Sequence, residues 1–341
     1  MMNGGTRRLP FMIFALAWTF VSPWNVLALV TQCSRRSFLP NIVGAGLIAT
    51  NPAIAAADED ILRPPPMPVP IAGLGAPLQP FVIHPWTAPA LRSKLGQERI
   101  QAVELSPLVP SLSPFADNDL FYPIRFQGTW EVRATLRQKV FPYGVSFVPS
   151  KSLIEGSPRY RKEMPDDTPT QYLSRYMTLD DGKKKNKIIA DRRFNSIDMT
   201  RAYNQLTPVE EVLWDPKKDP TLLKLNFAAG SMTADMMPLG PRRSEIYITG
   251  RKREEGEQYF AASERIRQVT LGSGAVTVSD TEIITEFQWD AGNDDEMKAV
   301  QRIAVYLTPN PNSREGVLWQ QVNGKAVAFF DYEMDMRRSS N

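Results

Sequence analysis

The sequence feature that most constrains the fold is the alternation of apolar and polar residues between residues 121 and 338. The segment 126–136 is the first example, with Trp130 on one face of an extended chain and Glu131 and Arg133 on the other. A period of two residues is typical of strands that bury one face and expose the other. A chain built from such segments has to pair them, because an isolated strand cannot bury its apolar face in water.

The expected strands follow one another at short, regular intervals. They cover residues 126–136, 172–179, 187–194, 197–203, 210–213, 221–227, 244–250, 258–271, 276–290, 299–307, 316–322 and 326–336. Turn-forming residues separate several of them, and Asn323-Gly324 is the strongest hairpin signal. Helical periodicity is almost absent, so we expect an all-β fold. The expected architecture is an antiparallel meandering β-barrel over residues 121–338, with a sandwich as the alternative.

The last expected strand, 326–336, indicates which residues line the barrel. Its inward face begins with small residues and continues with bulky ones, as a tapering interior requires. The inward aromatic residues that we consider candidate ligand contacts are Trp130, Phe287, Trp289, Phe330 and Tyr332. The alternative is that these aromatic side chains fill the barrel themselves.

Arginines inside apolar strands are the second group of candidate ligand contacts. They are Arg192, Arg193, Arg265 and Arg267. A guanidinium group can bind a carboxylate or phosphate head group through two parallel hydrogen bonds. The alternative is that each arginine pairs with an acidic residue on a neighbouring strand, as cross-strand charges commonly do.

Gly128-Thr129-Trp130 on the first strand, with Arg337 near the end of the last, resembles the pattern of lipocalin, or calycin, barrels. The resemblance implies that Trp130 seals one end of the barrel and that Arg337 packs over its ring in a cation–π contact. Lipocalins have eight strands, whereas this chain offers ten or more. The further lipocalin motifs are not evident.

Several short stretches resemble the DUF6816 family of cyanobacteria and plastids. They are Tyr122-Pro123, 126–132, 189–195, Ala202-Tyr203, 307–311 and 328–332. The resemblance implies a photosynthetic setting and supports the β-barrel. It implies no activity, because the family is uncharacterised.

Residues 1–57 are expected to direct the chain to its compartment. Residues 1–28 have the layout of a secretory signal peptide, and 34–57 resembles a twin-arginine export signal carrying Arg35 and Arg36. Two signals in tandem suit the thylakoid lumen of an alga with a secondary plastid, and a bacterial twin-arginine export substrate is the alternative. Both apolar runs fall short of the roughly 20 residues of a spanning helix, so we expect no transmembrane helix in the mature chain.

Residues 58–120 are expected to form a proline-rich linker. Nine prolines fall between residues 61 and 90, and proline lacks the amide hydrogen that a helix or an inner strand requires. An extended tether is therefore the default for this composition. Weak helical periodicity between residues 90 and 105 allows at most one short helix.

Composition excludes several classes of chemistry. The single cysteine, Cys33, lies in the targeting segment and His84 is the only histidine, so we expect no disulfide, no metal site and no cofactor. No nucleophile or phosphate-binding motif is present, and we name no catalytic residue. Without residues 1–57 the chain carries 36 basic and 37 acidic residues, a net charge of −1, which gives no electrostatic basis for binding nucleic acid.

Three functions remain. The first is a non-enzymatic lumenal barrel that binds a hydrophobic small molecule (a lipid, pigment or quinone) in its interior. The second is a photosystem assembly or accessory factor that contacts thylakoid membrane proteins. The third is an enzyme acting on a lipid or pigment, which the scarcity of histidine and cysteine disfavours. A large apolar cavity would favour the first function, and a filled interior the second.

Overall fold

The structure is a computed structural model of the chain. It describes residues 81–82, 86–108, 119–150, 153–154, 165, 168–179, 187–203, 208–228, 230–231, 240, 242–272, 275–310 and 313–340. Both expected export signals with Arg35 and Arg36, as well as Cys33 and His84, lie outside these residues. Within the described ranges, no helix is both long enough and apolar enough to cross a membrane.

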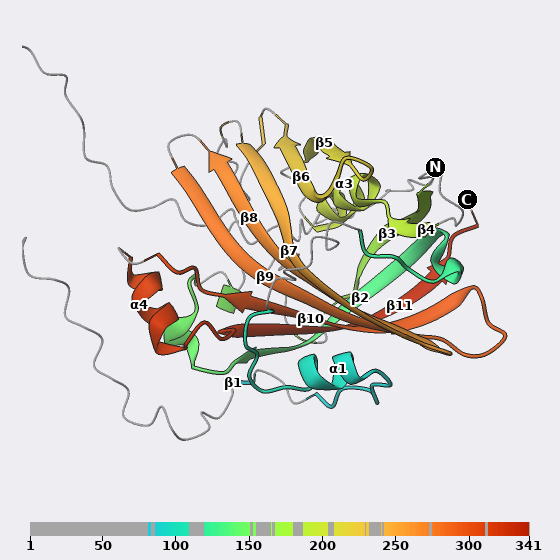
Figure 1. Cartoon of the computed structure of the whole chain (residues 1–341), viewed down its shortest axis with the longest axis horizontal. Helices are drawn as coiled ribbons and strands as arrows, with labels where there is room; N and C mark the ends of the chain where they lie inside the picture. The colour runs from blue at the N-terminus through green and yellow to red at the C-terminus, as the bar shows by residue number, and fades with distance from the viewer. Residues whose placement is uncertain are drawn as a thin grey trace, which may run out of the picture. The chain divides into compact units, whose positions relative to one another are not determined.

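Ten strands form one antiparallel sheet, which curls into a half-barrel (Figure 1). In spatial order they are β4 (Lys187–Ala190), β3 (Thr170–Leu179), β2 (Gly128–Phe141), β11 (Ala328–Arg338), β10 (Glu296–Tyr306), β9 (Ala275–Gln288), β8 (Tyr259–Gly272), β7 (Arg242–Gly256), β6 (Asp219–Phe227) and β5 (Val209–Asp215). An eleventh, short strand, β1 (Phe81–Val82), pairs with the end of β2. The expectation of an all-β antiparallel fold is confirmed.

The first and last long strands of the sheet, β2 and β11, are direct neighbours, as they would be in a closed barrel. From this pair outward, the other strands lie side by side in chain order. The two edge strands of the sheet are therefore β4 and β5, which are consecutive in the sequence but are not paired in the sheet. Helix α3 (Arg192–Tyr203) connects these two strands in sequence and packs against β3 and β5 (Figure 1). A helix thus occupies the place where a strand pair would close the barrel.

Two expected strands, 187–194 and 197–203, are corrected by α3. The chain is extended only as far as Ala190, and Asp191 is the residue that precedes the helix. Its carboxylate accepts a hydrogen bond from the amide of Phe194 at 3.0 Å, as the side chain that caps a helix N-terminus does. The capped helix therefore begins where the alternation in the sequence predicts that the strand continues to residue 194.

Helix α3 also covers an open edge of β3. The carboxylate of Asp198 accepts a hydrogen bond from the amide of Leu173, and the side-chain oxygen of Asn195 accepts one from the amide of Arg175, each at 2.6 Å. Strand β4 pairs with β3 only from Tyr176 onward. The helix therefore satisfies backbone groups that an edge strand would otherwise expose.

The expected strand 316–322 is also wrong, because these residues belong mostly to helix α4 (Arg314–Gln321). Ser313 caps the start of this helix with its hydroxyl. Asn323 and Gly324 follow the helix with φ values of 53° and 68°, the left-handed conformation that ends many helices. The strongest hairpin signal of the sequence therefore marks a helix end, since both motifs require positive φ.

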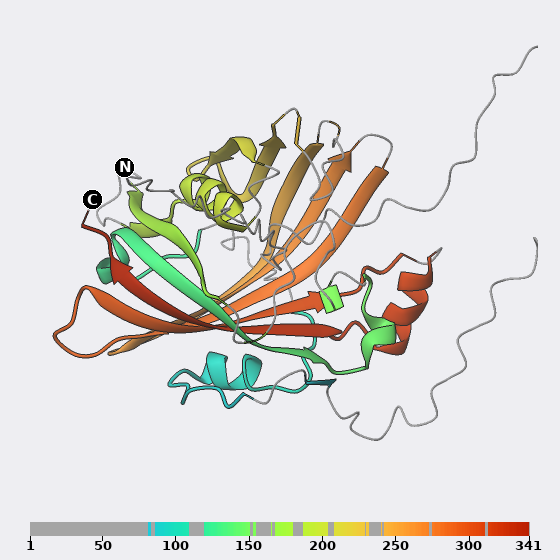
Figure 2. The ribbon, with the colours of Figure 1, turned by 180° about the vertical axis from the view of Figure 1, so that it is seen from behind.

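Residues 86–108, expected to be linker, pack on the convex face of the sheet. They include the short helix α1 (Lys94–Arg99), which lies on the opposite side of the sheet from α3 (Figure 2). Leu91 and Ile100 are buried there against β9, β10 and β11. We call residues 86–108 the strap, because they cross several strands in the part of the chain that the composition assigns to a tether.

Side chains on the concave face form two apolar clusters. The aromatic cluster is built around Phe126, Trp130, Tyr176, Phe260 and Phe287. The second cluster is built around Leu136, Phe141, Ile303, Phe330 and Tyr332. Two short 3-10 helices, η1 (Ile124–Phe126) and η2 (Val145–Phe147), flank the two ends of β2. Strands β2, β10 and β11 contribute buried residues to both clusters.

Candidate functional site

A partly open cavity of about 140 Å³ lies on the concave face, bordered by members of the aromatic cluster. Helix α3 and strand β3 form one side of it, and strands β8 to β11 form the floor. Its position follows from the register of the sheet, because inward-facing residues of neighbouring strands stand side by side. Three of these residues, Ala262, Thr285 and Gln301, are consecutive partners across β8, β9 and β10.

Apolar side chains make up much of the cavity wall. Phe287 comes from the aromatic cluster, Met334 and Met336 come from β11, and Met199 comes from α3. Methionine side chains are unbranched and polarisable, so they adapt to ligands of different shape. The wall is therefore suited to an apolar molecule.

A small number of polar groups face the same space. The side-chain amide of Gln301 donates a hydrogen bond to the Thr285 hydroxyl at 2.9 Å. The Tyr172 hydroxyl contacts the sulfur of Met334 at 3.6 Å. Burial raises the pKa of Tyr172 well above its ordinary value of 10.0, so its hydroxyl stays protonated and can donate a hydrogen bond.

The charged members of the cavity lining are Arg192 and Glu264, and they bind one another. The Arg192 guanidinium donates to both oxygens of Glu264, at 2.8 and 3.2 Å. It also donates to Asp119 at 2.8 Å. Arg251 completes the group by donating to Glu264 at 3.1 Å. We call these four residues the buried ion group, and it holds two positive and two negative charges.

The pKa shifts of Glu264 and Arg192 favour the charged form of both residues. Desolvation alone would raise the pKa of Glu264, but the charges of Arg192 and Arg251 outweigh it and the pKa lies below the ordinary value of 4.5. Desolvation opposes the charge of Arg192 too, yet Glu264 and Asp119 raise its pKa. Each charge is therefore held by its partners.

The candidate aromatic residues of the sequence analysis are divided between the two clusters. Trp130, Phe287 and Trp289 lie in the aromatic cluster, and Phe330 and Tyr332 lie in the second cluster. All five are buried. Phe287 is the one that lines the cavity, while the other four pack against their own clusters.

The four candidate arginines are not brought together. Arg192 reaches the cavity, whereas Arg193 is exposed on another side of α3. Arg265 and Arg267 point to the convex face, where both form ion pairs with Asp280, at 3.7 and 2.8 Å. The expectation that charges inside strands pair with one another therefore describes Arg265 and Arg267. Arg192 pairs with Glu264 as well, but from helix α3.

The cation over Trp130 is Arg338, not Arg337. The Arg338 guanidinium lies 4.6 Å from the centre of the Trp130 ring and donates to the carbonyl oxygen of Gln127 at 2.7 Å. Trp130 and Arg338 are direct cross-strand partners, so both side chains stand on the same face. Arg337 is one residue out of phase and pairs with Glu296 on the exposed face.

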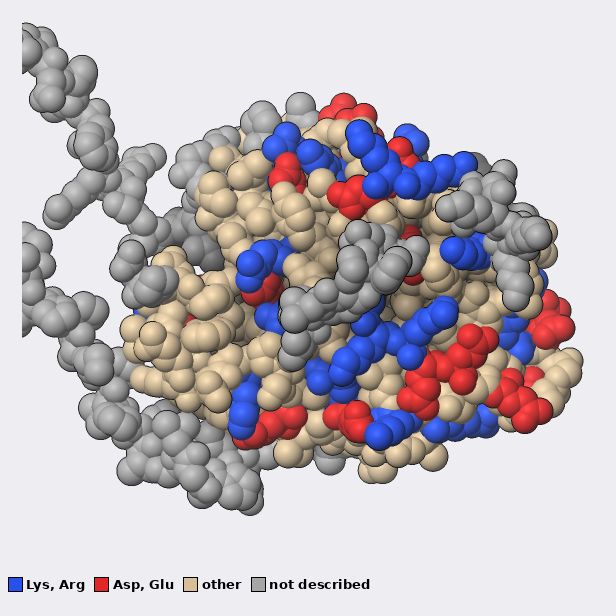
Figure 3. Space-filling view, in the orientation of Figure 1, with Lys and Arg blue, Asp and Glu red and all other residues tan. Residues whose placement is uncertain are grey.

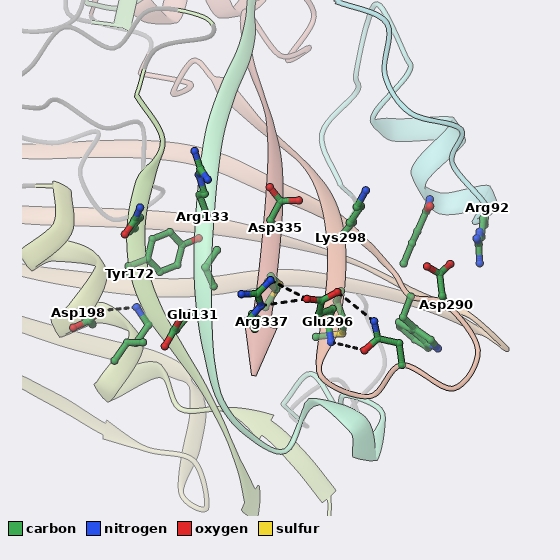
Figure 4. Close-up of a pocket in the computed structure, with 18 residues that line it drawn as sticks. Arg92, Glu131, Arg133, Tyr172, Asp198, Asp290, Glu296, Lys298, Asp335 and Arg337 are labelled. Atoms are coloured by element: carbon green, nitrogen blue, oxygen red, sulfur yellow. Dashed lines mark hydrogen bonds and ion pairs between the residues drawn. The ribbon is translucent and has the colours of Figure 1, made fainter. Parts of the chain in front are cut away.

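A second concave feature, of about 930 Å³, lies on the convex face beside the strap (Figure 4). Three neighbouring strands carry Arg133, Asp335 and Lys298 across its floor at consecutive register positions. Within the described part of the chain, none of the three forms an ion pair. Figure 3 shows that basic and acidic side chains lie next to one another over much of one face of the molecule. We call the concave feature that carries Arg133, Asp335 and Lys298 on its floor the charged groove.

The candidate residues predicted from the sequence do not include Thr285, Gln301, Glu264 or Asp119. Glu264 stands at an even position of β8, whereas Arg265 and Arg267 stand at odd positions. Because side chains alternate between the two faces of a strand, this even position is the sequence signal that predicts an inward carboxylate. Thr285 and Gln301 show the same inward phase on β9 and β10. Asp119 lies before the first long strand, and no local pattern links it to α3. Across the described residues, no cluster of His, Cys, Asp and Glu side chains could hold a metal ion.

Comparison with known protein families gives a match over most of the chain. The model of a domain of unknown function, DUF6816, matches residues 114–340. Comparison with curated proteins and with solved structures yields no match. The match includes every strand from β2 to β11, so it covers the cavity, the buried ion group and the strands that form the floor of the charged groove.

Proposed function

The chain belongs to the DUF6816 family, and we propose that it is a non-enzymatic binding protein for a hydrophobic small molecule such as a lipid, pigment or quinone. The cavity on the concave face would hold this molecule. The observation that carries the proposal is the composition of the cavity wall: apolar side chains with a few convergent polar groups, on a rigid sheet. Binding sites for small molecules typically have this composition.

The size of the cavity limits how the ligand binds. A cavity of about 150 Å³ holds a molecule the size of benzene, and this one measures about 140 Å³. A ring or a chain end of the ligand would therefore fill it and contact lining residues such as Phe287 and Met334. The remainder of a longer molecule would extend through the open side of the cavity.

The ionisable groups of the cavity support binding rather than catalysis. Arg192 and Glu264 are paired with one another, and a general acid or base needs a pKa near the working pH. Burial raises the pKa of Tyr176 to about 12, so this phenol also stays protonated. An enzyme acting on a lipid or pigment is therefore the weaker interpretation.

The setting that we propose is the thylakoid lumen. The twin-arginine signal around Arg35 and Arg36 and the tandem arrangement of two export signals support it. Export of a bacterial protein by the twin-arginine route is the alternative setting. Fusion of residues 1–57 to a fluorescent reporter, followed by fractionation of the plastid, distinguishes the two.

The proposal is tested by mass spectrometry of small molecules extracted from residues 58–341 purified from their own organelle under mild conditions. We expect one hydrophobic molecule in a stoichiometric amount. The control is the same extraction from the protein after denaturation and refolding in detergent-free buffer. Recovery of no enriched molecule from the native protein would contradict the proposal.

A second candidate function is an assembly or accessory factor that contacts thylakoid membrane proteins, and the charged groove favours it. Arg133, Asp335 and Lys298 present charges of alternating sign that form no ion pair with any described residue, and a partner could match these charges. The double variant Arg133→Glu/Lys298→Glu should then lose most of its retention on immobilised, detergent-solubilised thylakoid proteins at low salt. Arg193→Glu is the control, and equal retention of both variants would exclude the groove as the contact surface.

A further inference from the structure

We infer that the cavity selects an electrically neutral ligand and recognises it through a hydroxyl or carbonyl group, rejecting anions despite the arginine in its wall. This inference rests on the proposed binding function. It also differs from the expectation drawn from the sequence, in which an arginine inside a strand holds a carboxylate or phosphate head group. The buried ion group is the reason for the difference.

The charges that line the cavity sum to zero. Arg192 and Glu264 are the charged residues of the lining, and they are bound to each other at 2.8 Å. The residues behind them, Asp119 and Arg251, add one negative and one positive charge. Arg192 is 5% exposed and Asp119 is 1% exposed, so water screens this group very little. A ligand entering the cavity therefore meets no uncompensated charge.

An anion would lose its hydration without gaining a free cation. Among the described residues the Nε of Arg192 has no hydrogen-bond partner. To bind this guanidinium, a carboxylate of the ligand would still have to approach Glu264 or Asp119, each of which has an oxygen 2.8 Å from the same guanidinium nitrogen. Two carboxylates at one guanidinium repel each other in a medium of low dielectric constant. Displacing Glu264 instead would leave that carboxylate buried and less well paired, which is strongly unfavourable. Both routes penalise an anionic ligand.

Neutral hydrogen-bonding groups remain to recognise the ligand. The amide of Gln301 uses one of its two N–H groups on Thr285, and an amide side chain has two donors and an acceptor oxygen. Among the described residues, the Tyr172 hydroxyl has the sulfur of Met334 as its hydrogen-bond partner, at 3.6 Å, and thioether sulfur is a weak acceptor. These groups match a hydroxyl or a carbonyl oxygen, since each can donate and Gln301 can also accept.

The inference is tested with two probes of equal chain length, 1-decanol and decanoate, at pH 7.5. Binding to the mature chain is measured by native mass spectrometry and by displacement of a neutral fluorescent probe. We expect decanol to bind at least tenfold more tightly than decanoate. Decanoate binding as tightly as decanol, or more tightly, would overturn the inference and leave the proposed function standing.

Failure of the proposed function gives a different result, because neither probe would then bind. The variant Glu264→Gln adds a direct test of the mechanism. It keeps a hydrogen-bond acceptor for Arg192 but removes one negative charge, so the ratio of decanoate to decanol affinity should rise at least fivefold. Glu255→Gln, on an exposed part of β7, should leave the ratio unchanged. An unchanged ratio of decanoate to decanol affinity in Glu264→Gln would also count against the inference. The comparison of the two probes on the wild-type protein remains valid even if this variant does not fold.

Discussion

At the scale of single residues, Arg192 has the most consequences. It is the first residue of α3, yet it reaches Glu264 on β8 and Asp119 before β2. It therefore ties the helix that closes the half-barrel to the floor of the cavity. Removing one member of a buried ion pair leaves the other charge buried without compensation, which typically costs about 3–5 kcal/mol.

We therefore expect Arg192→Met to lower the free energy of unfolding by about 3–5 kcal/mol. The neighbouring variant Arg193→Met is a matched control, because Arg193 is exposed and its loss should change stability by less than about 0.5 kcal/mol. Urea denaturation of both variants measures the difference. Equal stability of the two variants would show that the buried ion group does not hold the fold.

Glu264 should make the stability of the protein depend on acidity. Its pKa in the folded protein lies below the ordinary value of 4.5, so its carboxylate stabilises the fold above pH 4.5. This contribution is lost as the pH falls through the lower folded-state pKa. We expect the free energy of unfolding to fall less steeply below pH 4.5 in Glu264→Gln than in the wild-type protein. Identical slopes in urea titrations at several pH values would contradict this, and Glu255→Gln should keep the wild-type slope.

At the scale of elements, the strap is held to the convex face by buried carboxylates. Glu286 accepts hydrogen bonds from the amides of Arg92 and Ser93, at 2.6 and 3.0 Å, and from the Ser93 hydroxyl at 2.5 Å. Glu282 binds Arg99 farther along the strap. These contacts join residues almost two hundred positions apart, so composition alone cannot reveal them.

We expect Glu286→Leu to lower the free energy of unfolding by about 2–4 kcal/mol, because buried donors at the start of α1 lose their acceptor. The amide hydrogens of Arg92 and Ser93 should also exchange with solvent much faster than in the wild-type protein. Hydrogen exchange read by mass spectrometry on a peptide that spans α1 measures this. Glu255→Leu is the control, and unchanged exchange in Glu286→Leu would show that the strap is held by other contacts.

The same scale shows which elements a sequence pattern can predict. Alternation identifies the long strands and their inward faces, and Trp130 and Tyr332 are buried as their phase predicts. Helices α3 and α4 escape the pattern, and α3 is fixed by contacts with strands β3 and β5. The hydrogen bond from the amide of Leu173 to Asp198 is one such contact, and it spans 25 residues. Propensity is a weak guide where tertiary contacts of this kind decide the conformation.

At the scale of the whole molecule, the fold is a meandering sheet whose ends are bridged by a helix. Strands β2 and β11 meet as in a barrel, while α3 stands between β4 and β5. This arrangement brings the cavity, the buried ion group and α3 into one place. The sequence predicts the inward aromatic residues of the site, but not the pairing of Arg192 with Glu264, which are 72 residues apart. Such a pair depends on where α3 packs, and the periodicity of apolar and polar residues does not predict the packing position of a helix.

The central claim, that the cavity binds a hydrophobic molecule, is tested most directly by filling it. Ala262 is buried and lines the cavity, so Ala262→Leu should occupy part of its 140 Å³. The matched control is Ala291→Leu, in an exposed turn. Native mass spectrometry of the three proteins purified from their own organelle is the measurement. We expect the wild-type protein and Ala291→Leu to carry the same additional neutral mass and Ala262→Leu to have lost it. An identical bound mass in all three proteins, or none in any, would contradict the claim.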